Sequence, residues 1–89
     1  MSEIHYKIRR RGFPDMYSKG TMYYQWNDKG KTFDTLGKLR SYITRCMNDD
    51  YMRKYLHEFE VIEYEVSQRS IKELVDIVKP EKIMDLLKQ

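Results

Sequence analysis

Residues 23 to 47 constrain the fold of this chain most, because the spacing of their apolar side chains changes from a strand pattern to a helix pattern. From Met22 to Trp26 every second residue is apolar or aromatic, which is typical of a β-strand with two distinct faces. Residues 27 to 30 predict a turn, in which Gly30 adopts positive φ at little cost. Residues 31 to 33 then predict the returning strand of a β-hairpin.

A helix is predicted directly after this hairpin. Asp34 and Thr35 are both residue types that cap helix starts. Apolar side chains then recur at helical spacing, at Leu36, Leu39, Ile43, Cys46 and Met47. A hairpin that leads into an amphipathic helix is a small folding unit, and the rest of the chain can pack against it.

The N-terminal segment predicts another strand. Ile4, Tyr6 and Ile8 alternate with cationic or polar residues, and the run Arg9 to Arg11 closes the pattern. Residues 12 to 15 predict a loop and residues 16 to 21 a further turn. The N-terminal half therefore predicts a three-stranded antiparallel meander.

The C-terminal half contains segments with helical spacing and one segment with strand spacing. Residues 48 to 50 predict the end of the helix and a fresh cap, followed by a short helical stripe from Tyr51 to Leu56. Residues 58 to 67 predict a fourth strand, and its glutamates suit pairing with the cationic first strand. Residues 70 to 78 fit a capped helix, and residues 83 to 87 fit a last short helix that either covers the core or joins a second subunit as a homodimer. The expected fold class is α+β, a small antiparallel sheet of three to four strands with helices packed on one face.

The chain of 89 residues suits one domain, residues 1 to 89, with one modest core. Hydrophobic residues make up 40% and charged residues 35%, which argues against wholesale disorder. No apolar run approaches the roughly 20 residues that cross a bilayer, and the N-terminus lacks the apolar core of a secretion signal. One cysteine, Cys46, excludes an internal disulfide. We expect a cytoplasmic protein without a membrane partner.

Signals for catalysis are weak, so we expect no enzyme. Only His5 and His57 are available as histidines, and Cys46 lies on the apolar stripe, where an inert buried thiol is expected. Gly30-Lys31-Thr32 resembles the end of a phosphate-binding loop, but Gln25 stands where that pattern needs glycine. We expect no catalytic residues, no metal site and no cofactor.

Binding of an anionic partner is better supported, and the net charge of +3 agrees with it. The chain also carries eight tyrosines, more than a small core easily hides. On a helix, Lys38, Ser41 and Arg45 project to one side, away from the apolar stripe. The residues expected to bind phosphate or a base are Arg9, Arg10, Arg11, Tyr17, Lys19, Tyr23, Lys31, Lys38, Tyr42 and Arg45.

Several short motifs resemble a group of small tailed-bacteriophage proteins. The motifs are Tyr17-Ser18-Lys19-Gly20, Trp26, Gly30-Lys31-Thr32-Phe33, Leu36-Gly37-Lys38-Leu39, Tyr42-Ile43 and Val61-Ile62-Glu63-Tyr64-Glu65. They occur in matching order over roughly residues 6 to 66, although Thr21 stands where the group commonly has a second glycine. The resemblance implies a phage accessory protein made inside the bacterial host cell, and it carries over no catalytic residue.

Two functions follow as hypotheses. In the first, the protein is a host-modulating or counter-defence factor that binds nucleic acid or a signalling nucleotide through its cations and tyrosines. In the second, it is a protein–protein inhibitor of a host enzyme or defence complex, with exposed Tyr, Met and Arg side chains as anchors.

Overall fold

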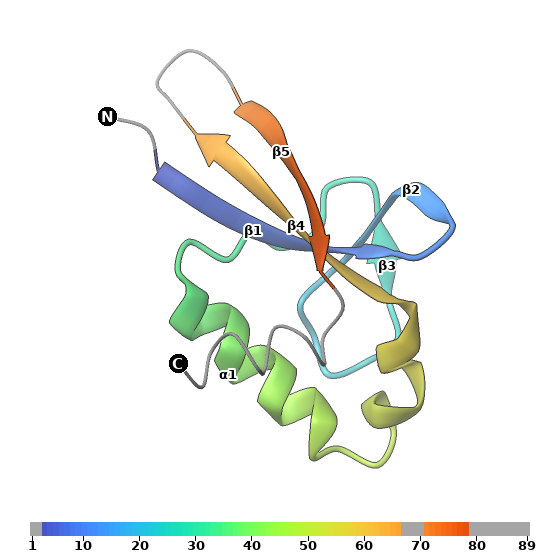
Figure 1. Cartoon of the computed structure of the whole chain (residues 1–89). Helices are drawn as coiled ribbons and strands as arrows, with labels where there is room; N and C mark the ends of the chain where they lie inside the picture. Colours follow the sequence, from blue (N-terminus) through green and yellow to red (C-terminus); the bar gives the residue numbers. More distant parts are fainter. Residues whose placement is uncertain (1–2, 67–70, 79–89) are drawn as a thin grey trace.

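The computed structural model describes residues 3–66 and 71–78. Its five-stranded antiparallel sheet has the order β3-β2-β1-β4-β5 (Figure 1). The strands are β1 (Glu3–Arg10), β2 (Phe13–Ser18), β3 (Trp26–Asn27), β4 (Phe59–Val66) and β5 (Ile71–Val78). The helices are α1 (Leu36–Met47) and the 3-10 helix η1 (Met52–Glu58). The α+β class predicted from the sequence is confirmed, with five strands in place of three to four.

Strands β1 and β4 form the centre of the sheet, and their pairing follows the alternation of their side chains. The register runs from Glu3 opposite Val66 to Arg10 opposite Phe59. This places Ile8 and Val61 together on the face that packs against α1, where both are buried. The predicted fourth strand and its pairing with the first strand are therefore confirmed.

Helix α1 lies below the sheet in Figure 1 and covers its lower face. Thr35 caps it, because the Thr35 side chain accepts a hydrogen bond from the Lys38 amide. Leu39, Ile43 and Cys46 are fully buried in the core, as the apolar stripe predicts. The predicted helix and its cap are thus confirmed, while Leu36 and Met47 at its two ends stay exposed.

The predicted hairpin of residues 22–26 and 31–33 is wrong. Strand β3 has only two residues and pairs with β2, while Phe33 forms an isolated bridge with Tyr6 of β1. The predicted turn between them is present, with Gly30 at a φ of 66° and its amide bonded to the Asn27 side chain. A three-stranded antiparallel meander is present, but it consists of β1, β2 and β3 rather than the three predicted strands.

The predicted loop at residues 12 to 15 and the turn at 16 to 21 are also wrong for residues 13 to 18, which form β2. The register of β2 passes from Phe13 opposite Arg10 to Tyr17 opposite Arg9, so the intervening residues bulge. Pro14 falls in that bulge, where the strand does not need its missing N–H group.

The predicted helix over residues 70 to 78 is wrong, because residues 71–78 form strand β5 along β4. Ile71, Leu74, Val75 and Val78 fit helical spacing, but β-branched side chains also favour strands. The open edge of β4 supplies a hydrogen-bonding partner that the sequence pattern does not reveal. The predicted helix over residues 83 to 87, and the dimer contact proposed for it, lie outside the described residues. Within those residues, no helix is long and apolar enough to cross a membrane.

Candidate functional site

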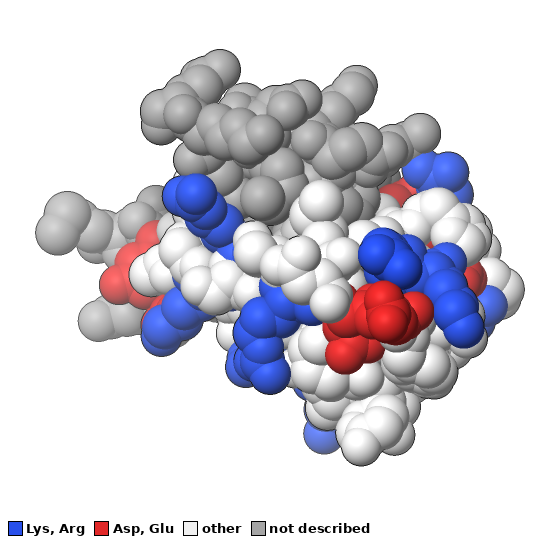
Figure 2. Space-filling view, turned by 90° about the horizontal axis from the view of Figure 1, so that it is seen from below, with Lys and Arg blue, Asp and Glu red and all other residues white. Residues whose placement is uncertain are grey.

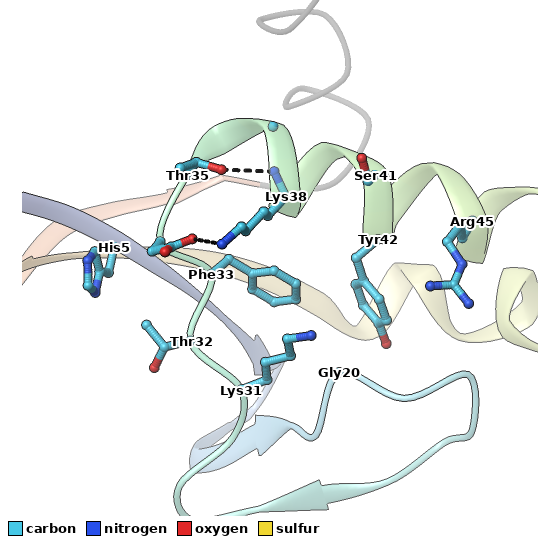
Figure 3. A pocket seen from close by; sticks show the side chains of 12 residues that line it. His5, Gly20, Lys31, Thr32, Phe33, Thr35, Lys38, Ser41, Tyr42 and Arg45 are labelled. Carbon is cyan, nitrogen blue, oxygen red and sulfur yellow. Dashed lines mark hydrogen bonds and ion pairs between the residues drawn. The ribbon is translucent and has the colours of Figure 1, made fainter.

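One pocket brings together four of the ten residues that the sequence predicts to bind a ligand. Lys31, Lys38, Tyr42 and Arg45 all line it, and its cavity volume is about 870 Å³ (Figure 3). We call it the α1 pocket. The described residues that line it are His5, Gly20, Lys31, Thr32, Phe33, Asp34, Thr35, Gly37, Lys38, Ser41, Tyr42 and Arg45.

Local structure explains how these side chains meet. Lys38, Ser41 and Arg45 lie at helical spacing on α1, so one side of the helix forms a wall of the pocket. Lys31 comes from the extended segment before α1, and its amide donates to the Ser18 carbonyl at 2.8 Å. A Cβ atom at Gly20 would lie 2.4 Å from Lys31 Cδ, so the glycine leaves room for the lysine stem.

The charge in the α1 pocket is mainly positive. Among the described lining residues, Asp34 is the one carboxylate, and its Oδ1 lies 2.8 Å from Lys38 Nζ. The hydrogen bond from Lys38 lowers the pKa of the Asp34 carboxyl below its ordinary value. Lys31 and Arg45 form no ion pair with another described residue, and Figure 3 shows both directed toward Tyr42.

Tyr42 forms part of the wall rather than an open stacking surface. Its side chain is buried, with 5% of the residue exposed. Its hydroxyl donates to the Thr21 carbonyl at 2.8 Å, and burial raises its pKa far above the ordinary value. Phe33 is 3% exposed, and the side chain of His5, the third ring in the pocket, is 19% exposed. A base inside the α1 pocket therefore finds little exposed ring surface for stacking.

The arginine run lies elsewhere, and internal carboxylates hold it. Arg10 Nε is 3.0 Å from Glu58 Oε1. Arg9 and Arg11 both approach Glu60, at 3.8 Å and 3.7 Å from their Nε atoms. The run does not line the α1 pocket, and its charges are largely compensated within the fold.

The remaining predicted residues are dispersed. Tyr17 is half-buried on β2, with Lys7 Nζ 5.2 Å from its ring centre. Lys19 is exposed directly after β2, and Tyr23 is 67% exposed in the following loop. Neither lines the α1 pocket.

Tyr23 instead lines a second hollow, which we call the Tyr23 groove. Its described lining residues are Met22, Tyr23, Asp49 and Tyr51, and its volume is about 400 Å³. Sequence reasoning missed Tyr51 here and His5 and Thr32 in the α1 pocket. Ser41 was recognisable from its helical spacing. Thr32 and Tyr51 lie in connecting segments that no periodicity describes, and the alternation along β1 does not reveal that His5 borders this pocket.

Among the described residues on the side of the molecule that Figure 2 shows, positive charge does not form one broad patch. Figure 2 shows lysine and arginine side chains interspersed with acidic ones on this side of the molecule. The net charge of +3 is therefore less informative than the local excess of cations in the α1 pocket.

Cys46, the candidate nucleophile that the sequence argued against, is fully buried. Burial raises the pKa of its thiol, which leaves it less thiolate than an exposed cysteine. Over the part of the chain that the structure describes, no three His, Cys, Asp or Glu side chains gather as a metal site would need.

The likeness of residues 6 to 66 to short phage proteins stays a prediction from short motifs. Comparison of the chain with protein-family models, with curated proteins and with solved structures finds no match.

Proposed function

We propose that this protein is a non-catalytic binding protein that holds a phosphate-bearing ligand, nucleic acid or nucleotide, in the α1 pocket. One observation carries the proposal: Lys31, Lys38 and Arg45 line a single open pocket in which Asp34 is the one described carboxylate. Three cations against one carboxylate leave an excess of positive charge, which attracts phosphate oxygens.

The hydroxyl groups of the pocket support the same ligand. Thr32 and Ser41 both line it and can donate to phosphate oxygens. Lys38 is already paired with Asp34, so a ligand phosphate competes with that carboxylate or shares the lysine with it. We assign the main contacts to Lys31 and Arg45, and we give Arg9, Arg10 and Arg11 no direct contact, because Glu58 and Glu60 hold them.

The proposed setting is that of a phage-type accessory protein in the cytoplasm of a host bacterium. It would act there by capturing a ligand, as a host-modulating or counter-defence factor. This part of the proposal is supported only by the motif resemblance over residues 6 to 66.

The protein–protein inhibitor is the second candidate function, and a specific observation favours it. Tyr23, Met47 and Tyr51 are 67%, 38% and 44% exposed. Exposed tyrosine and methionine side chains are common anchors of protein interfaces.

Binding measurements on a matched pair of variants test the first function. The probes are ATP, followed by calorimetry, and a labelled oligothymidylate of about twelve nucleotides, followed by fluorescence anisotropy. Lys31→Ala with Arg45→Ala should weaken binding of at least one probe by about tenfold or more. Arg53→Ala with Lys54→Ala removes the same charge from η1, outside the α1 pocket, and should change binding by less than about twofold.

Equal losses in the two double variants would mean that net charge alone attracts the probes, which contradicts the proposed pocket. Capture of one host protein from nuclease-treated bacterial lysate, undisturbed by Lys31→Ala with Arg45→Ala, would favour the inhibitor.

A further inference from the structure

The α1 pocket and the Tyr23 groove are neighbours along one side of α1. The loop after β2 borders both, since Gly20 lines the pocket while Met22 and Tyr23 line the groove. The hydrogen bond from the Tyr42 hydroxyl to the Thr21 carbonyl ties this loop to α1 between the two hollows. On the other side, Arg45 lines the pocket and Asp49, four residues later, lines the groove.

The two hollows offer complementary chemistry. The α1 pocket has two cations, Lys31 and Arg45, without an ion-pair partner among the described residues. Its Phe33 and Tyr42 rings are 3% and 5% exposed, and the side chain of His5 is 19% exposed. The Tyr23 groove has two open rings, Tyr23 and Tyr51. Its carboxylate, Asp49, accepts hydrogen bonds from the backbone amides of Tyr51 and Met52, each at 2.9 Å. Because a carboxylate repels phosphate, the groove suits a base better than a phosphate.

The geometry points to single-stranded nucleic acid as the ligand, with its phosphates in the α1 pocket and a base stacked on Tyr23. This inference rests on the proposed function and names its ligand class. A single nucleotide inside the pocket would gain charge contacts but little stacking, whereas a strand reaches both hollows. A free base is required for stacking on an exposed tyrosine, which excludes a paired duplex.

The spacing of the cations agrees with a strand. Lys38 and Arg45 are seven residues apart on α1, which corresponds to about 10 Å along the helix axis. Cations spread along the pocket wall in this way can contact successive phosphates of one strand.

The test compares two labelled strands by fluorescence anisotropy, an oligothymidylate of about twelve nucleotides and an abasic strand of the same length. The native protein should bind the oligothymidylate more tightly than the abasic strand, by about tenfold. Tyr23→Ala should remove most of this difference and leave affinity for the abasic strand unchanged. Tyr23→Phe keeps the ring and should bind both strands as the native protein does.

Phe13→Ala is the matched control, because Phe13 is also an exposed ring, at 48%, but lies on β2 and lines neither hollow. It should leave both affinities unchanged. Lys31→Ala with Arg45→Ala should weaken the binding of both strands. It should also reduce the slope of log affinity against log salt concentration by about 1.4, the value for two lost contacts with a single strand.

Three results would overturn the inference. Equal affinity of the native protein for the two strands would show that it makes no base contact. If Tyr23→Ala bound both strands as the native protein does, Tyr23 would not be the residue that contacts the base. ATP binding as tight as the oligothymidylate would assign the pocket to a nucleotide. In each case a loss caused by Lys31→Ala with Arg45→Ala would keep the proposed function, while absence of any binding would end both.

Discussion

Glu58 holds the Arg10 side chain in an ion pair within the fold. Burial alone would raise the pKa of its carboxyl, but hydrogen bonds from the Tyr24 hydroxyl at 2.7 Å and Arg10 Nε at 3.0 Å hold the pKa below its ordinary 4.5. Arg10 also lies over the Phe13 ring, with its guanidinium carbon 4.2 Å from the ring centre. These contacts give the arginine a structural role.

This arrangement predicts how stability depends on pH. Because the folded pKa of Glu58 is lowered, its contribution is present above about pH 4.5 and is lost as pH falls through the folded value. Glu58→Gln should therefore reduce the free energy of unfolding by about 1 kcal/mol at neutral pH, a modest value because the site is partly exposed. In urea unfolding, the difference from the native protein should shrink near pH 3.

Asp50→Asn is the control for this experiment. The Asp50 side chain is 94% exposed and pairs with Arg53, so its removal should change the free energy of unfolding by less than about 0.5 kcal/mol at either pH. A Glu58→Gln effect that stayed constant down to pH 3 would show that its carboxylate charge is not what stabilises the fold.

Of the four predicted residues that line the α1 pocket, three lie on α1, and Lys31 lies in the segment before it. Helical spacing placed Lys38 and Arg45 on one side of α1, and the structure keeps them there. The arginine run looked equally suitable, but its partners Glu58 and Glu60 lie about fifty residues away in the chain. Pairing of the two strands was predicted, but only the register between β1 and β4 shows which of these charges meet.

At the scale of single elements, the turn before α1 depends on Gly30. Its φ of 66° is a conformation that other residues adopt at a cost, and an added Cβ atom would lie 2.3 Å from Tyr17 Cβ. Gly30→Ala should therefore lower the free energy of unfolding by about 2 kcal/mol or more, measured by urea unfolding.

Gly37 provides the opposite case in the first turn of α1. The nearest atom to its added Cβ would be Thr35 Oγ1 at 3.8 Å, and its backbone is helical. Gly37→Ala should leave stability unchanged or raise it by up to about 1 kcal/mol. If both variants lost the same stability, the turn geometry at Gly30 would not be the cause.

Elements differ in how much of them the sequence determines. The bounds of α1 were predictable because a cap, an apolar stripe and a following polar stop agree. Strand β5 was not predictable, because its residues fit both the helical and the strand spacing. Pairing with the edge of β4 decides that they form a strand. Strand β2 was missed since Gly12 and Pro14 suggest a loop, and the bulge that accommodates Pro14 depends on β1.

At the scale of the whole molecule, one core joins the sheet to both helices. Ile8 and Val61 from the sheet, Ile43 and Cys46 from α1 and Met52 from η1 belong to the same buried cluster. Because each layer buries its apolar side against the other, separating α1 from the sheet exposes the entire cluster. We therefore expect the described fold to open as one unit rather than layer by layer.

The thiol of Cys46 tests this cooperativity, since it is fully buried within the shared core and burial raises its pKa. In the native protein it should react with an aromatic disulfide reagent at least about a thousandfold more slowly than in urea, because reaction needs opening of the fold. Ser41→Cys places a second thiol on the exposed side of the same helix and should react fast without urea. At low urea the Cys46 rate should rise as steeply as the global unfolding constant. A Cys46 reaction rate that does not depend on urea concentration would mean that α1 leaves the sheet by a local motion. The fold would then not open as one cooperative unit.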